Sequence, residues 1–142
     1  MTLAVRRARP ADLPVCADIY IVTVSVTFPG EPATAAAFAE SIVGEEQWVA
    51  ILDGDIIGYI SVYWPTNFIH SLYIHPEFQS RGAGRALLAE VRKLAEGDME
   101  LKTDKANVRA FTFYRRLGWR AVGEGMAASG PWWRLRWTGG RP

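Results

Sequence analysis

The chain has 142 residues, of which 49% are hydrophobic and 22% are charged. This balance is that of a folded globular protein rather than a disordered or fibrous one, and we expect a single domain over residues 1–142. With 16 basic against 15 acidic side chains, the formal net charge of +1 gives no overall field that favours nucleic acid or an anionic membrane. We therefore expect neither as a partner, and any bound anion must be held by a local site.

Cys16 is the single cysteine, which excludes an intramolecular disulfide and a multi-cysteine zinc site. Met1–Arg7 lacks the apolar segment of a signal peptide. No apolar run approaches the roughly 20 residues that span a bilayer. We therefore expect a cytoplasmic protein with no metal site.

The amino-terminal half predicts a strand, two helices and an antiparallel pair of strands. Asp12 is placed to cap the first helix, and Thr34 is placed to cap the second. Asp53 and Gly54 are a strong hairpin signal because they separate two apolar runs rich in β-branched and aromatic residues. The predicted strands are residues 3–8, 47–52 and 56–64, and the predicted helices begin after residue 12 and cover residues 35–43.

The carboxyl-terminal half predicts strands and helices in alternation, followed by two final strands. Gly97 and Gly118 are placed to end the two helices, and Asp104 is placed to cap the second of them. The predicted strands are residues 67–74, 99–103, 119–124 and 132–137, and the predicted helices are residues 82–96 and 110–117. This order indicates an α+β fold, a mixed sheet with helices packed on it, rather than a doubly wound one.

A glycine-rich turn, Gly82-Ala83-Gly84, joins a predicted strand to a predicted helix. Backbone N–H groups at a helix start lack an intrahelical partner and lie at the positive end of the helix dipole. Glycines let the backbone approach a phosphate closely, and Arg81 and Arg85 can add charge-assisted contacts. Position 87 is leucine, so the dinucleotide-binding fingerprint does not fit. The turn indicates a site for two successive phosphates, with a plain strand-to-helix turn as the alternative.

Two segments resemble motifs of the GNAT superfamily of acetyltransferases: residues 72–88, LYIHPEFQSRGAGRALL, and residues 107–119, NVRAFTFYRRLGW. The first carries the pattern Q/R-x-x-G-x-G/A after a strand that ends in x-P, and the second resembles N-x-x-A-x-x-F-Y-x-x-x-G-F/W. The resemblance implies a GNAT-type mixed, mostly antiparallel sheet with helices on both faces, and acetyl-CoA as cosubstrate. The cofactor-binding residues that it implies are Leu72, Tyr73, Ile74, Gln79, Ser80, Arg81, Gly82, Ala83, Gly84, Arg85, Asn107 and Tyr114.

The family reaction is direct attack of a neutral amine on the thioester, which releases a CoA thiolate. The resemblance places Tyr114 at the position of the general acid, and a backbone N–H near Leu72 as the donor to the oxyanion. A core aromatic is the alternative role for Tyr114. Asn107 is implied to contact the cofactor arm, with helix capping as the alternative.

The general base is less directly indicated, because Lys102 occupies the position where some family members have a glutamate. His70 is our first candidate, directly or through water, since histidine side chains commonly titrate near neutrality. A structural role is its alternative. Glu31 and Glu40 are weaker candidates for the base, and His75 is expected to be structural.

We expect the acceptor to be a primary amine of a small or amino-acid-like molecule. A protein N-terminus or lysine is the alternative, and a catalytically silent acetyl-CoA sensor is a third reading. Four tryptophans are candidates for lining an acceptor pocket, with core or dimer contacts as the alternative: Trp64, Trp132, Trp133 and Trp137. A homodimer is a family-level expectation.

Overall fold

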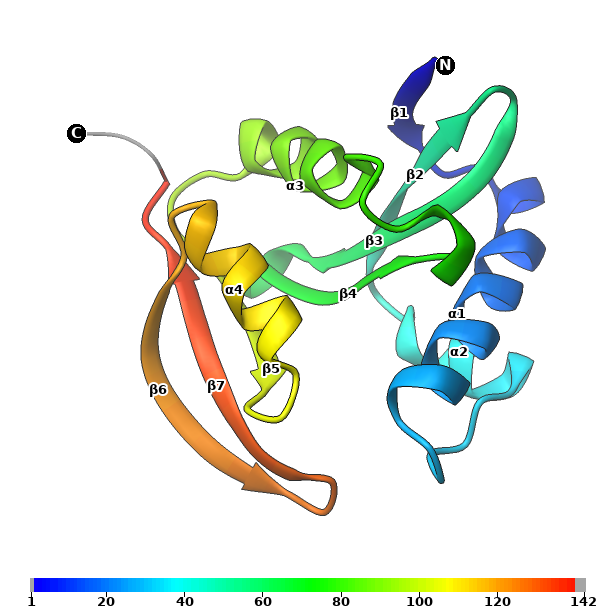
Figure 1. The fold of residues 1–142 in the computed structure, drawn as a ribbon. Helices are drawn as coiled ribbons and strands as arrows, with labels where there is room; N and C mark the ends of the chain where they lie inside the picture. Colours follow the sequence, from blue (N-terminus) through cyan, green and yellow to red (C-terminus); the bar gives the residue numbers. More distant parts are fainter. Residues whose placement is uncertain (1, 140–142) are drawn as a thin grey trace.

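Residues 2–139 are described in the computed structural model, and they form one seven-stranded mixed sheet with α-helices on its two faces (Figure 1). The strand order is β1-β2-β3-β4-β5-β7-β6, and every neighbouring pair is antiparallel except the parallel pair β4–β5. The strands are β1 Leu3–Arg7, β2 Glu46–Leu52, β3 Asp55–Tyr63, β4 Phe68–Ile74, β5 Met99–Asp104, β6 Arg120–Ala127 and β7 Gly130–Trp137. The helices are α1 Leu13–Thr27, α2 Ala35–Ser41, α3 Ala83–Leu94 and α4 Val108–Arg116, with short 3-10 turns at Pro10–Asp12, Trp64–Thr66 and Pro76–Phe78. The predicted α+β order of strands and helices is confirmed.

The sheet separates two hydrophobic clusters, one on each face. On one face α3 and α4 pack over the sheet, and Leu87 of α3 is fully buried there. On the other face α1 and α2 pack over the sheet, and Cys16 of α1 is fully buried. Successive residues of β2 belong to opposite clusters, as the two-residue period of a strand requires: Val49 packs beneath α1 and α2, and Ala50 packs beneath α3 and α4. The central strands are therefore buried on both faces.

Two of the predicted capping carboxylates do not bond to their helices, and hydrogen bonding explains why. Asp12 stands at the N-cap position of α1, but its carboxylate accepts instead from the backbone N–H of Arg9 at 2.7 Å and from the Arg6 guanidinium at 2.7 and 3.1 Å. Asp104 stays in β5, opposite Trp132 of β7, so the cap of α4 falls to Asn107. The predicted cap at Thr34 is confirmed, since its hydroxyl accepts from the N–H of Ala37 at 3.0 Å.

The carboxyl-terminal hairpin and the end of α3 also differ from the sequence prediction. β6 runs to Ala127, so Gly125, which was expected in the connection, lies inside the strand. α3 ends at Leu94, before Gly97, although Gly97 does adopt a positive φ of 101°. Pairing along the whole length of β7 overrides the loop signal of the glycines.

β4 and β5 separate soon after they start, and this divergence forms the site. Their parallel pairing consists of Phe68 with Glu100 and Ile69 with Leu101. At the same point β3 advances by one residue while β4 advances by two, which leaves His70 as the extra residue of a β-bulge. In Figure 1 the two strands run apart beyond this position. The bulge turns β4 away from β5.

One segment comes closer to a membrane-spanning length than the sequence analysis expected. Pro10–Thr27 comprises 18 residues and is apolar enough to pass a test of length and composition. In the fold it packs on the sheet and buries Cys16, Ile19 and Val24. The core helix of a soluble protein passes the same test, so this segment is weak evidence for a membrane span.

The ion pair of Asp12 with Arg6 makes the stability of the fold fall at acid pH. The hydrogen bond from Arg6, helped by that from the Arg9 N–H, lowers the pKa of Asp12 to about 2. The resulting stabilisation is complete above the ordinary aspartate pKa of about 3.9 and is lost as the pH falls through about 2. Asp12→Asn should therefore lower the melting temperature at neutral pH and flatten its fall in acid.

The matched control is Asp18→Asn, which removes an exposed carboxylate from α1, the helix that follows Asp12. Thermal unfolding followed by circular dichroism at several acid pH values measures both changes. Equal acid sensitivity of the wild type and Asp12→Asn would contradict this role of the Arg6–Asp12 pair.

Candidate active site

A cleft of about 340 Å³ lies between the diverging strands. One wall is β4 from Ile69 to Tyr73, the other is β5 from Leu101 to Asp104, and α4 contributes Ala110 and Tyr114. Trp132 of β7 and Phe28, next to α1, complete it. Several predicted site residues from separate parts of the chain therefore meet in one cavity: His70, Leu72, Tyr73, Asn107 and Tyr114.

The backbone of β4 offers hydrogen-bonding groups to this cleft. The N–H of His75 donates to the carbonyl of Ile57 on β3 at 2.8 Å. Bonding alternates along an antiparallel ladder, so Tyr73 also faces β3, whereas Leu72 and Ile74 direct their N–H and C=O groups towards the β5 side. β5 has left the ladder there. An extended ligand can therefore pair with Leu72 and Ile74 as another strand would.

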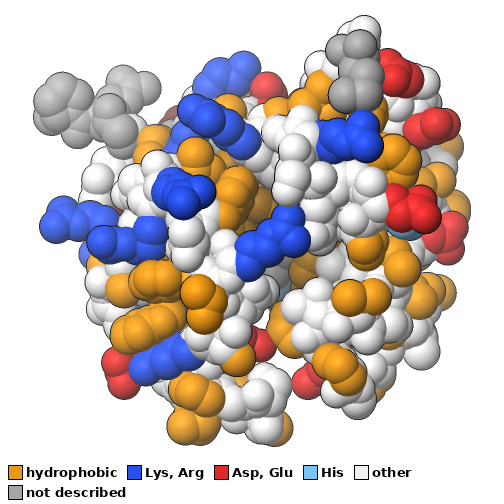
Figure 2. Space-filling model, in the orientation of Figure 1, with side chains coloured by type: hydrophobic (Ala, Val, Ile, Leu, Met, Phe, Trp, Pro, Cys, Tyr) orange, Lys and Arg blue, Asp and Glu red, His pale blue; other side chains and the backbone are white. Residues whose placement is uncertain are grey.

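The predicted phosphate turn has the geometry of an anion site. Gly82 caps α3 with a φ of +85°, and the first bond inside the helix runs from Ala86 N–H to the Gly82 carbonyl. The N–H groups of residues 83–85 therefore precede the intrahelical pattern. Ser80 also has a positive φ, of 64°, which is uncommon for a residue other than glycine. Figure 2 shows basic side chains gathered over α3 and α4 on this face, and they complement a phosphate.

Gly84 lies beside α4. A Cβ at this position would lie 3.4 Å from the Phe113 ring, which is an ordinary van der Waals contact, so this packing does not require glycine and the expected approach of the backbone to a phosphate stays a prediction. Arg109, also on α4, donates from Nη2 to the Ser80 hydroxyl at 3.0 Å. Arg109 was not among the predicted site residues. It lies in the first turn of a helix far along the chain, and nothing in the sequence near it pointed to Ser80.

Tyr114 lies on the inner face of α4 with 9% of its surface exposed, and its side chain lines the cleft. Burial raises the pKa of its phenol well above the ordinary value. The side chain is thus protonated at neutral pH and offers an O–H donor. The alternative packing role is confirmed, since Tyr114 packs edge-on against Trp119, and the general-acid role stays a prediction.

Asn107 performs the capping role that the sequence analysis held as the alternative. Its Oδ1 accepts from the N–H of Ala110 at 3.1 Å, which begins α4. Asn107 also lines the cleft. With Oδ1 in the cap, the amide nitrogen is the group that can donate to a bound molecule.

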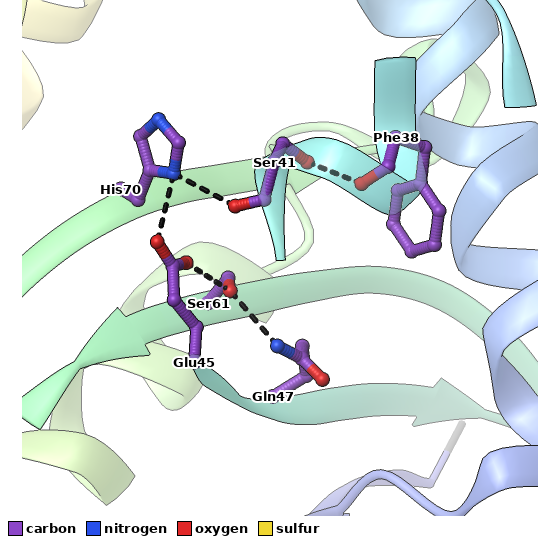
Figure 3. Close-up of polar contacts among 6 residues, drawn as sticks. All are labelled: Phe38, Ser41, Glu45, Gln47, Ser61 and His70. Atoms are coloured by element: carbon purple, nitrogen blue, oxygen red, sulfur yellow. Dashed lines mark hydrogen bonds and ion pairs between the residues drawn. The ribbon is translucent and has the colours of Figure 1, made fainter. Parts of the chain in front are cut away.

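His70 is held by two acceptors (Figure 3). Its Nδ1 lies 2.9 Å from the carbonyl of Ser41 and 2.9 Å from Oε2 of Glu45. Because both partners can only accept, Nδ1 carries a proton, and the lone pair of the neutral ring is on Nε2. Nε2 points away from both partners in Figure 3. His75, in contrast, is structural as expected: its Nδ1 accepts from the Glu77 N–H at 3.1 Å.

A second cavity of about 220 Å³ adjoins the cleft and shares Phe28, Tyr73 and Asp104 with it. Its walls also include Tyr20 and Glu31. Burial, with the charges of Glu31 and Glu40, raises the pKa of Tyr20. Burial, with smaller effects of Tyr20 and Asp104, raises the pKa of Tyr73 to about 12. The cavity is therefore aromatic and anionic.

The four tryptophans separate into one that lines the cleft and three that do not. Trp132 lines it, and a Cβ at Gly125 would overlap its indole, so the glycine makes room for the ring. Lys102, which replaces the family glutamate, places Nζ 4.4 Å from the centre of this ring. The other three pack against the core cluster beneath α3 and α4: Trp64, Trp133 and Trp137.

Within residues 2–139 no group of three or more His, Cys, Asp or Glu side chains is placed to hold a metal ion. The chemistry that the described residues offer is an anion site, a strand edge for an extended ligand, a buried phenol and an imidazole with an outward lone pair.

Comparison with known proteins places this geometry in a family. The Acetyltransferase (GNAT) family model matches residues 15–119. The uncharacterized N-acetyltransferase YafP of Escherichia coli K12 is 28% identical over an alignment of 130 positions, and the match covers 84% of this chain and 83% of that protein. The N-alpha-acetyltransferase RimI of Mycobacterium tuberculosis H37Rv is 38% identical over 58 residues, 39% of this chain and 35% of that protein.

A solved structure agrees at the level of fold. The PaiA N-acetyltransferase of Thermoplasma acidophilum, solved in complex with coenzyme A, superposes with a TM-score of 0.80 at 18% identity. The match covers 97% of this chain and 99% of that one. The chain therefore belongs to the acetyltransferase (GNAT) family, whose members are acetyl-CoA-dependent N-acetyltransferases.

Proposed function

We propose that this protein transfers the acetyl group of acetyl-CoA to the primary amine of a small cationic acceptor by direct attack. The observation that carries the proposal is the pair of cavities at the divergence of β4 and β5, which share Phe28, Tyr73 and Asp104 in their walls. The cleft leads along the exposed edge of β4, which precedes the helix start of α3. The second cavity presents carboxylates and aromatic rings to a cation. The positive helix start of α3 suits the phosphates of acetyl-CoA, and the carboxylates of the second cavity suit a cationic amine.

The acceptor is expected to lack a carboxylate near its reactive amine. Glu31 and Asp104 line the second cavity, and a negative group placed beside them would be repelled. Tyr20, Phe28 and Tyr73 supply rings on which an ammonium or an apolar body can rest. This favours a simple amine over an amino acid within the acceptor class that the sequence analysis expected.

The residues of the cleft divide the chemical work. The N–H of Leu72 is directed to the side where a thioester carbonyl would lie, and it serves as the oxyanion donor. Tyr114 donates a hydrogen bond to the departing sulfur, and its raised pKa means that it stabilises the thiolate rather than transferring its proton fully. The residues 83–85 bind the pyrophosphate through their N–H groups.

Acetylation of a protein N-terminus is the second candidate, and the partial match to an N-alpha-acetyltransferase favours it. A free N-terminus is also a primary amine, but it arrives on a chain that must enter the same cavity. The acceptor panel below therefore includes short peptides beside simple amines.

The proposed function is tested by calorimetric titration with acetyl-CoA and by thiol release over the acceptor panel. Cys16 will not interfere, because it is fully buried and burial raises the pKa of its thiol to about 12. Gly82→Glu should abolish binding, since it places a carboxylate at the phosphates and forces a positive φ on a side chain.

Binding with amine-dependent thiol release supports the proposal. Binding without release over the whole panel would instead support the sensor reading. Failure of the wild-type protein to bind acetyl-CoA would overturn the assignment of the cleft. Wild-type affinity of Gly82→Glu for acetyl-CoA would show that the turn at residues 82–84 does not bind the phosphates.

Tyr114→Phe should lower kcat by about 10- to 100-fold, because the variant lacks the hydroxyl that donates a hydrogen bond to the leaving sulfur. The affinity for acetyl-CoA should stay within about twofold, because the ring that packs on Trp119 is retained. Pre-steady-state thiol release separates chemistry from product release. An unchanged rate of the chemical step would show that Tyr114 has only a packing role.

Glu31→Gln and Asp104→Asn should each raise the KM for a cationic amine about fivefold, the effect of roughly 1 kcal/mol of lost attraction. The KM for acetyl-CoA should not change. Glu96→Gln is the matched control, since it removes the same charge from an exposed position outside both cavities. Equal effects of all three variants would show that only net charge matters and would refute the acceptor site.

A further inference from the structure

Glu45 is a nearly buried carboxylate that the family motifs do not include. Only 8% of its side chain is exposed, although it lies just before β2 at the sheet surface. Burial of a carboxylate is costly unless hydrogen bonds replace its water. Its two oxygens have separate partners: Oε1 accepts from the Ser61 hydroxyl at 2.5 Å, and Oε2 lies 2.9 Å from Nδ1 of His70. The carboxylate is thus fully committed to two groups.

The donors of this network all run towards the carboxylate (Figure 3). The Gln47 amide donates to the Ser61 oxygen at 3.0 Å, so the Ser61 hydroxyl hydrogen is directed to Glu45. Ser61 is fully buried and Gln47 is 9% exposed. Ser61, itself held by Gln47, therefore fixes the position of the Glu45 carboxylate. Such an arrangement fixes the orientation of whatever the second oxygen binds.

That second oxygen binds the residue at the bulge. His70 leaves the register of β4, its ring is 48% exposed, and it lines the cleft two residues before Leu72. The carbonyl at the end of α2, that of Ser41, holds the same Nδ1. The ring cannot turn over without losing both partners. Nε2 is consequently the atom that His70 offers to a ligand.

We propose that Glu45 is a positioning residue for acetyl transfer, which holds His70 in the tautomer whose Nε2 accepts a proton from the acceptor ammonium. This inference rests on the proposed function. The proton of the ammonium passes to Nε2 and later to water, and Glu45 faces the imidazolium while it exists. The amine nitrogen then bonds to the thioester carbon and the C–S bond breaks. The second proton of that nitrogen ends on the CoA sulfur.

Other charged groups line the cleft together with His70. Lys102 and Asp104 of β5 line the same cavity, and Glu45 is the carboxylate in contact with the ring. The test must separate Glu45 from these groups. Glu46→Gln provides a matched control, because Glu46 is the next residue and pairs on the surface with Arg7.

The first measurement is spectroscopic and does not need activity. The chain has two histidines, so long-range ¹H–¹⁵N correlation spectra can assign the protonated nitrogen of each ring. In the neutral form of the His70 ring, we expect the wild type and Glu46→Gln to carry the proton on Nδ1. Glu45→Ala should show a smaller fraction of this tautomer, because only the Ser41 carbonyl still accepts from Nδ1. An unchanged tautomer in Glu45→Ala would overturn the positioning role.

The second measurement is kinetic. Glu45→Gln should lower kcat about tenfold and move the acid limb of the pH–rate profile to lower pH, with the Kd for acetyl-CoA unchanged. Glu45→Asp should recover part of the loss. Should Glu45→Gln not fold, Ser61→Ala leaves the Glu45–His70 pair and removes its anchor, so a smaller loss of kcat is expected. A Glu45→Gln profile identical to that of Glu46→Gln would refute the catalytic part.

The two proposals can fail separately. A wild-type protein that releases no thiol with any acceptor refutes the proposed function, and with it the catalytic part of this inference. The spectra still support or overturn the control of the His70 tautomer by Glu45. Active wild type together with an unaffected Glu45→Gln variant refutes the inference alone.

Discussion

The separation of β4 from β5 after Ile69 is the constraint on which the site depends. A parallel pair that continued to Ile74 would satisfy the backbone groups of Leu72 and Ile74 and would close the cleft. The bulge at His70 prevents this by adding one residue to β4 at the point of divergence. The strand is still held on its other edge by β3, so one edge becomes available without loss of the sheet. The open edge is therefore supported by a rigid scaffold.

Charge is then distributed along the opening in two opposite regions. At the α3 end, the helix start and Arg109 near Ser80 provide a positive environment. At the other end, Glu31 and Asp104 provide a negative one. A net charge of only +1 hides this separation, because the two regions cancel in the total. The expectation that any anion must be bound locally agrees with this arrangement.

The order of strands and helices and the glycine turn that begins α3 could be predicted from the sequence, because both depend on signals between residues near in sequence. The cap at Asp104 was wrong because pairing with Trp132, a long-range contact, kept that residue in β5. Arg109 and Glu45 were missed for the same reason: their partners, Ser80 and His70, lie 29 and 25 residues away. The cytoplasmic location and the homodimer stay predictions.

The bulge also explains why a histidine at this position can act although a lone strand histidine is usually structural. An ordinary β4 residue points to one face and takes its environment from that face alone. His70 is displaced from the register, so its ring reaches the carbonyl of Ser41 and the carboxylate of Glu45 with one nitrogen while the other nitrogen points away. The irregularity that opens the strand edge for the thioester thus also orients the imidazole beside it. The cleft and the proposed base therefore have a common structural origin, and removing the bulge would remove both.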